Sequence, residues 1–163
     1  MKKFLILSVA LLVLVSVAFA GYGDYYKVRT SAKVAESQGD IAKASEMYLS
    51  AEAEASVLAA QDGMKLPWAT YAEWQRNNAA YVYVNDFKVK TDWVAAMEAI
   101  KAIPNGPERL AAAEALKSKA APYVSELKTA LAILNGKEFV KAEVMAKVKS
   151  NKEFCVWVLE FVK

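Results

Sequence analysis

The sequence contains no histidine, and Cys155 is its single cysteine among 163 residues. Without histidine the chain cannot build a serine-histidine triad, an imidazole proton shuttle or a histidine metal ligand. One cysteine excludes an internal disulfide and a cysteine-rich zinc site. We therefore expect no catalytic residues of a recognised kind, no metal and no cofactor. The Cys155 thiol has apolar neighbours, which favours a buried side chain.

Glycine and proline are scarce as well, with six and four residues, whereas 56% of the residues are hydrophobic and alanine is abundant. Few helix breakers and many alanines favour helices throughout. The 21 basic residues barely exceed the 18 acidic ones, and this near balance argues against a nucleic-acid partner. The length suits one domain with a core of ordinary size.

The first 20 residues have the pattern of a secretory signal peptide. Met1-Lys2-Lys3 gives a short positive start, an uncharged run follows to Phe19, and Ala18-Phe19-Ala20 is a small-x-small cleavage pattern before Gly21. Removing these residues takes away two lysines and no acid, so the remaining 143 residues carry a net charge of +1. We expect an exported protein, periplasmic or extracellular and of bacterial origin, with no membrane span after cleavage. The alternative is an uncleaved anchor.

Apolar residues recur at helical spacing through residues 21–163, which predicts a single all-α domain of six to eight short helices. The candidate turns that separate the helices contain glycine, proline or asparagine. The expected helices are 24–38, 41–60, 67–84, 91–103, 107–119, 122–134, 137–150 and 153–163. The last of these is rich in aromatic and β-branched residues that also suit a strand. We favour a helix there because the chain offers no second strand for it to join.

Residues 25–58 resemble a tetratricopeptide repeat, a 34-residue pair of antiparallel helices. In such a repeat, small residues let the two helices approach and one large ring fills the space between them. The positions that match are the large apolar Val28, the small Ala32, the turn Gly39-Asp40, and the small-aromatic-small series Ala44, Tyr48 and Ala51.

A second and poorer match begins at Tyr71, with Trp74 at the large apolar position and Tyr81 at the aromatic one. Asn85-Asp86-Phe87 resembles its turn, but Asn78 stands where the family has a small residue. A third candidate repeat surrounds Asn135-Gly136. The resemblance implies antiparallel helical hairpins, and an irregular helical bundle unrelated to the family is the alternative.

The resemblance implies that the first helix of each pair faces an extended peptide. The exposed positions that correspond in this chain are Tyr26, Arg29, Lys33 and Glu36. Arg29 and Lys33 lie one helical turn apart and could hold a carboxylate from a chain terminus or an acidic side chain. The alternative is that they are ordinary solvated charges.

The aromatic helix 67–84 carries a second candidate site. Trp74, Asn78 and Tyr81 fall on one line of this helix, with Gln75 beside them. Aromatic faces flanked by amides suit a sugar ring or a peptide backbone, because an amide both donates and accepts hydrogen bonds. The alternative is that these rings belong to the core.

The sequence thus favours a non-enzymatic, exported interaction module of the cell envelope that binds a protein or peptide partner through an acidic group. The first alternative is a helical bundle that binds a small ligand or glycan through residues 67–84. The second is an acid-base hydrolase that uses Glu73 with Asp86 or Asp92, although no motif fixes the separation of these carboxylates.

Overall fold

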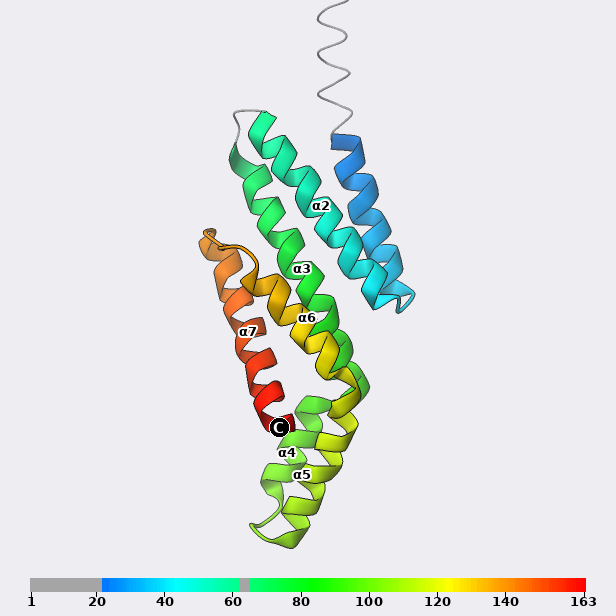
Figure 1. The fold of residues 1–163 in the computed structure, drawn as a ribbon, viewed down its shortest axis with the longest axis vertical. Coiled ribbons are helices and arrows are strands. Elements are labelled where there is room, and N and C mark those ends of the chain that lie inside the picture. Colours follow the sequence, from blue (N-terminus) through cyan, green and yellow to red (C-terminus); the bar gives the residue numbers. More distant parts are fainter. Residues whose placement is uncertain (1–21, 62–64) are drawn as a thin grey trace, which may run out of the picture.

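The computed structural model describes residues 22–61 and 65–163, which form helices and contain no strand (Figure 1). The all-α class expected from the sequence is confirmed. The predicted signal peptide lies outside the described residues. In chain order the helices are the first helix (residues 22–37), α2 (Ile41–Gln61), α3 (Lys65–Thr91), α4 (Trp93–Ala102), α5 (Pro107–Ala120), the 3-10 turn η1 (Ala121–Tyr123), α6 (Val124–Asn135) and α7 (Ala142–Val162).

The first helix and α2 are joined by the tight turn expected at Gly39-Asp40. Gly39 has a φ of 76°, in the left-handed region that glycine adopts without steric strain. The Asp40 N–H donates to the Ala35 carbonyl at 3.0 Å, which closes the first helix. The Asp40 carboxylate accepts a hydrogen bond from the Lys43 N–H at 3.2 Å and so caps α2. The two helices are therefore antiparallel neighbours.

Small side chains fill the seam between these two helices. Ala32 and Ala44 are fully buried, and Tyr48 packs in the same cluster as Ala79 and Val82 of α3. Small residues let the helix axes approach, and the tyrosine ring fills the remaining gap. The structure is an assembly of packed helices that is compatible with a helical repeat.

α3 is the central helix, since it packs against α2, α6 and α7. It is longer than predicted, and the turn expected at Asn85-Asp86-Phe87 is wrong. Phe87 is fully buried inside α3, and the Thr91 hydroxyl donates to the Phe87 carbonyl at 2.7 Å one turn later. Burial of Val84 and Phe87 in the core outweighs the local preference of asparagine and aspartate for turns.

One residue, Asp92, separates α3 from α4. Its φ of 51° is left-handed, a conformation that aspartate adopts more readily than most residues. The chain therefore changes direction sharply, and α4 and α5 form the end of the molecule opposite the end where α2 finishes and α3 begins (Figure 1). Trp93 is fully buried just after this bend and meets the rings of Phe87 and Phe161, with ring centroids at 5.1 and 5.3 Å.

The last part of the chain differs from the prediction. We expected two helices, 137–150 and 153–163, and the structure has a single helix, α7, preceded by the irregular segment 137–141. The Glu73 carboxylate of α3 accepts hydrogen bonds from the N–H groups of Val140 and Lys141, at 3.1 and 2.9 Å. These groups precede α7, so a side chain distant in sequence fixes where the helix begins.

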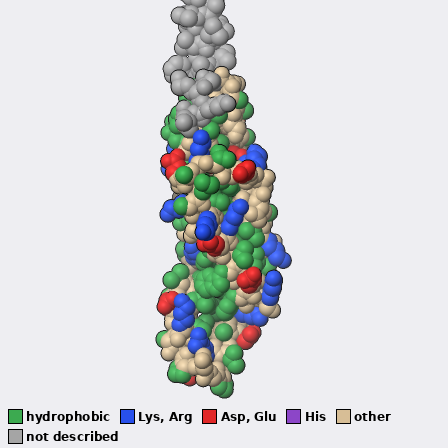
Figure 2. All heavy atoms as spheres, turned by 90° about the vertical axis from the view of Figure 1, so that its left-hand side faces the viewer, with side chains coloured by type: hydrophobic (Ala, Val, Ile, Leu, Met, Phe, Trp, Pro, Cys, Tyr) green, Lys and Arg blue, Asp and Glu red, His purple; other side chains and the backbone are tan. Residues whose placement is uncertain are grey.

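α7 buries one side against the rest of the protein. Cys155 and Val158 are fully buried, which confirms the expected burial of the thiol. Trp157 of the same helix is 41% exposed, although its ring contacts Trp93. The face of the molecule in Figure 2 has basic and acidic side chains interspersed, with hydrophobic side chains gathered toward the end that holds α4 and α5.

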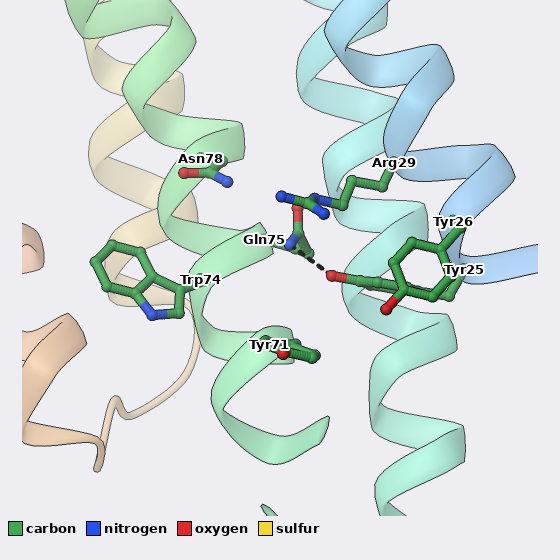
Figure 3. Close-up of a pocket in the computed structure, with 7 residues that line it drawn as sticks. All are labelled: Tyr25, Tyr26, Arg29, Tyr71, Trp74, Gln75 and Asn78. Atoms are coloured by element: carbon green, nitrogen blue, oxygen red, sulfur yellow. Dashed lines mark hydrogen bonds between the residues drawn. The ribbon is translucent and has the colours of Figure 1, made fainter. Parts of the chain in front are cut away.

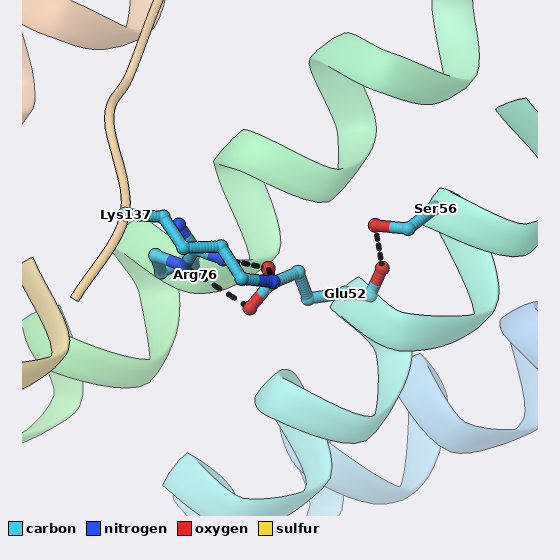
Figure 4. Close-up of polar contacts among 4 residues, drawn as sticks. All are labelled: Glu52, Ser56, Arg76 and Lys137. Atoms are coloured by element: carbon cyan, nitrogen blue, oxygen red, sulfur yellow. Dashed lines mark hydrogen bonds and ion pairs between the residues drawn. The ribbon is translucent and has the colours of Figure 1, made fainter.

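A buried ion group ties α2, α3 and the segment 137–141 together (Figure 4). Glu52 of α2 accepts hydrogen bonds from the Nε and Nη2 atoms of Arg76 on α3. Lys137 adds a third contact, with its Nζ 3.0 Å from Glu52 Oε1. Glu52 and Arg76 are both buried, so each ion neutralises the other away from water.

Candidate functional site

A pocket of about 280 Å³ opens between the first helix and α3 (Figure 3). It brings together residues from both sites expected from the sequence. Tyr26 and Arg29 come from the expected peptide site, and Trp74, Gln75 and Asn78 come from the expected ligand site. Tyr25 and Tyr71 complete the lining.

Helical spacing explains why these side chains meet. Tyr25 and Arg29 are four residues apart on the first helix, so they lie on one face of it. Tyr71, Gln75 and Asn78 follow each other at intervals of four and three on α3. Because the two helices lie side by side, these two faces enclose the pocket.

Tyr25 forms the aromatic base of the pocket. Its ring is almost fully buried and stacks on Tyr71, with ring centroids 6.2 Å apart and planes 12° from parallel. Gln75 donates a hydrogen bond from Nε2 to the Tyr25 hydroxyl at 2.9 Å. Burial raises the pKa of Tyr25, and the positive charge of Arg29 partly offsets this effect. The phenol therefore stays neutral at physiological pH.

Two polar atoms in the lining have no hydrogen-bond partner among the described residues. One is the donor Nε of Arg29, and the other is the acceptor Oε1 of Gln75, and both atoms are buried. Gln75 as a whole is only 3% exposed. A buried polar group without a partner carries a free-energy penalty of about 1–3 kcal/mol.

Lys33 and Glu36 lie outside the pocket. Lys33 is exposed further along the first helix. Glu36 instead accepts a hydrogen bond from the Tyr48 hydroxyl at 2.8 Å. Burial and this bond together raise the pKa of Tyr48. Of the four residues expected to bind a peptide, the structure brings Tyr26 and Arg29 together at the site.

Tyr81 lies at a neighbouring pocket of about 320 Å³ between α3 and α7. Its hydroxyl donates to Asn85 Oδ1 at 3.3 Å, and its ring is partly exposed, so it does not fill the core as the aromatic position of a repeat would. The second pocket shares Trp74 and Asn78 with the first. Its other lining residues are Asn77, Lys88, Lys147, Ser150 and Asn151.

Both pockets are electropositive. Arg29 is the charged residue that lines the first pocket, and Lys88 and Lys147 line the second. Neither of the two described linings includes a carboxylate. Arg29 also makes no ion pair with any residue in the described ranges. An anionic ligand would therefore meet an uncompensated positive charge in either pocket.

The carboxylates considered for acid-base chemistry have other partners. The Glu73 carboxylate accepts hydrogen bonds from the N–H groups of Val140 and Lys141. Asp86 forms an ion pair with Lys90 on the same helix, with Oδ2 2.7 Å from the lysine Nζ. Within residues 22–61 and 65–163, no cluster of three or more acidic or cysteine side chains could hold a metal ion. No helix in the same ranges is both long and apolar enough to cross a bilayer.

The sequence alone did not single out Tyr25 and Tyr71 as site residues. A signal for them was present, because the two segments matched to the repeat pattern begin at residue 25 and at Tyr71. Equivalent positions in neighbouring helical hairpins lie side by side, so these two rings were candidates to meet. Comparison of the chain with protein-family models, curated proteins and solved structures gave no match.

Proposed function

We propose that this chain is a non-enzymatic interaction module that binds a protein or peptide partner through an acidic group seated in the pocket between the first helix and α3. The observation that carries the proposal is that Arg29 makes no ion pair among the described residues and lines a pocket without a carboxylate. A charge-assisted hydrogen bond from its guanidinium to an acidic group would compensate this charge, and such bonds are about twice as strong as neutral ones.

The position of the pocket supports a macromolecular ligand. It lies on the first helix of the hairpin that resembles a tetratricopeptide repeat and on α3, where the poorer second match begins. In that family the first helices face an extended peptide. Tyr26 and Tyr71 are partly exposed at the pocket, so their rings can contact a ligand that arrives from solvent.

The charge of the pocket favours a peptide over the alternative ligand, a neutral glycan. Trp74, Gln75 and Asn78 would suit a sugar, and all three line the pocket. A neutral sugar, however, leaves the positive charge of Arg29 uncompensated, whereas a carboxylate neutralises it. The aromatic rings then serve as apolar walls beside the acidic group.

Titration calorimetry of the full-length chain tests this proposal. The probes are a pool of synthetic acidic peptides and a neutral trisaccharide. We expect the peptides to bind and Arg29→Met to weaken binding at least tenfold, whereas Lys33→Ala removes a cation outside the pocket and changes affinity less than twofold. Unchanged peptide affinity in Arg29→Met, or tighter binding of the trisaccharide, would reject the proposal.

The cellular location is part of the proposal and rests on residues 1–20 of the sequence. A positive start, an uncharged run and Ala18-Phe19-Ala20 support export to the periplasm or outside the cell. Mass spectrometry of the protein recovered from the expressing bacterium tests this. The expected mature chain begins at Gly21, and a chain that retains Met1 to Ala20 in the cytoplasm would contradict export.

A further inference from the structure

The second pocket, between α3 and α7, presents several of its lining side chains to solvent. Lys147 and Ser150 of α7 are exposed, and Tyr81 of α3 is 40% exposed. Trp74 and Asn78 of α3 are partly buried. A ligand that arrives from solvent therefore reaches a cation, a hydroxyl group, an amide and two aromatic rings.

Two lysines give this pocket its charge. Neither Lys88 nor Lys147 forms an ion pair with a residue in the ranges that the structure describes. Lys88 Nζ lies 4.2 Å from the centroid of the Phe154 ring. The face of an aromatic ring attracts a cation and holds it in place, but it does not neutralise the charge. The pocket therefore favours a ligand that carries negative charge.

The uncharged polar side chains of the lining can each both donate and accept hydrogen bonds. They are the amides of Asn77, Asn78 and Asn151 and the hydroxyls of Tyr81 and Ser150. Asn151 Nδ2 donates to Asn77 Oδ1 at 3.1 Å, and this buried bond between α7 and α3 fixes both amides. Sugar hydroxyl groups also donate and accept, so several of them around one ring can pair with such a lining. A nucleobase offers donors and acceptors only along its edges, so the lining suits a sugar better.

The aromatic walls and the size of the pocket also suit a sugar. Trp74 and Tyr81 stand seven residues apart on α3, so their rings project from the same face of the helix. The C–H groups on one face of a sugar ring form an apolar surface that packs against an aromatic ring. At about 320 Å³ the pocket lies at the lower end of the roughly 300–1,000 Å³ range of ligand pockets, which favours a ligand of about one sugar ring.

From these observations we infer that the pocket between α3 and α7 binds a sugar unit that carries an acidic group, either a carboxylate or a phosphate. The sugar ring packs against Trp74 and Tyr81, its hydroxyl groups pair with Ser150 and the asparagine amides, and its acidic group lies beside Lys147. The inference goes beyond the proposed function and does not rest on it, because Arg29 does not line this pocket.

Titration of the full-length chain followed by ¹⁵N–¹H NMR tests the inference. The reporter is the indole Nε1–H signal of Trp74, which is assigned by its loss in Trp74→Phe. The two probes, methyl glucuronide and methyl glucoside 6-phosphate, distinguish a carboxylate from a phosphate. Methyl glucoside lacks the acidic group, gluconate lacks the ring, and adenosine monophosphate adds a flat base. We expect at least one probe to shift the signal in a saturable way and each of these three controls to bind about fivefold more weakly or worse.

Variants of the protein assign the site. Lys147→Met should weaken binding of the acidic sugar about fivefold and remove its advantage over methyl glucoside. Lys149→Met is the matched control, because it removes the same charge from the same helix at a side chain that is 78% exposed and outside this pocket. It should change the affinity by less than about twofold, and so should Arg29→Met. Thermal unfolding of each variant confirms that it is folded.

The outcomes separate this inference from the proposed function. It is overturned if neither acidic sugar shifts the Trp74 signal, if methyl glucoside or gluconate binds as tightly, or if Lys147→Met binds as the wild type does. Tighter binding of adenosine monophosphate would assign the aromatic walls to a base and also overturn it. None of these results affects the acidic-partner proposal, which depends on Arg29. Acidic-sugar binding that Arg29→Met abolishes and Lys147→Met leaves intact would place the sugar in the first pocket, against the inference.

Discussion

Gln75 of α3 donates a hydrogen bond to the hydroxyl of Tyr25 on the first helix at 2.9 Å, and both side chains are buried. This contact joins two residues that are 50 positions apart in sequence and on different helices, at the base of the candidate pocket. It also orients the Gln75 amide so that Oε1 is left as the unpartnered acceptor. This bond therefore fixes the positions of two side chains that line the candidate pocket.

Replacing Tyr25 with phenylalanine should destabilise the protein by about 1–3 kcal/mol, because the buried Gln75 Nε2 loses its partner. Chemical denaturation measures the loss. The matched control is Tyr26→Phe, which removes a hydroxyl from a tyrosine that is 51% exposed and should change stability by less than about 0.5 kcal/mol. Equal stabilities for the two variants would show that the Gln75–Tyr25 bond contributes nothing to the fold.

Replacing Glu52 with glutamine should destabilise the protein by about 3–5 kcal/mol, because Arg76 would remain charged and buried without its counter-ion. Lys137→Ala removes the other cation of the group, but its side chain is 68% exposed. Its loss should change stability by less than about 1 kcal/mol. Urea titrations compare the two variants, and a larger effect for Lys137→Ala would contradict this account of the ion group.

Glu73→Ala should loosen the start of α7, because the N–H groups of Val140 and Lys141 lose their acceptor. By analogy with the loss of a helix cap, we expect about 0.5–2 kcal/mol of destabilisation. Glu73→Gln keeps one side-chain oxygen as an acceptor and should have a smaller effect. Amide hydrogen exchange should accelerate at positions 140 and 141 in Glu73→Ala, and unchanged exchange there would rule out this anchoring role.

Cys155 should make the protein less stable at alkaline pH. Burial raises its pKa to about 11 from an ordinary value of 9.0, and the nearby positive charge of Lys88 only partly opposes this. Above pH 9 the unfolded chain releases the thiol proton while the folded chain retains it, so stability is fully present below pH 9 and falls as the pH rises toward 11.

Denaturation of the wild type and Cys155→Ala between pH 8 and 11 checks this. The wild type should lose about 1–3 kcal/mol more than the variant over this range, because each unit of pKa difference corresponds to about 1.4 kcal/mol. Tyr25 and Tyr48 titrate in both proteins, so the difference between the two curves isolates the thiol. Parallel curves would mean that Cys155 does not couple to folding.

The part of the fold that the sequence predicted well is the first hairpin. Its turn is predicted by two adjacent residues, Gly39 and Asp40, and it forms there. Ala32, Ala44 and Tyr48 recur at helical spacing, and all three are buried in the cluster between the helices. In this hairpin the local preference for helix and turn agrees with the way the helices pack. The periodic pattern and the turn residues were therefore sufficient to predict both helices and their connection.

The predictions failed where distant contacts decide the outcome. Asn85-Asp86-Phe87 has the composition of a turn, but burial of Phe87 keeps the chain helical. The start of α7 depends on Glu73, more than 60 residues earlier, which no local pattern near Val140 reveals. The sequence also placed Arg29 and Gln75 in two separate candidate sites, because only the packing of the first helix on α3 brings them into one pocket.

The most direct test of the central claim observes the Nε–H group of Arg29 itself. In a ¹⁵N–¹H NMR spectrum of the full-length chain, this signal is assigned by its loss in Arg29→Lys. We predict that a synthetic acidic peptide shifts the Arg29 Nε–H signal in a saturable way and that the same peptide with amides in place of its acidic side chains does not. A peptide that binds and perturbs other signals while the Arg29 Nε–H signal stays in place would contradict the account.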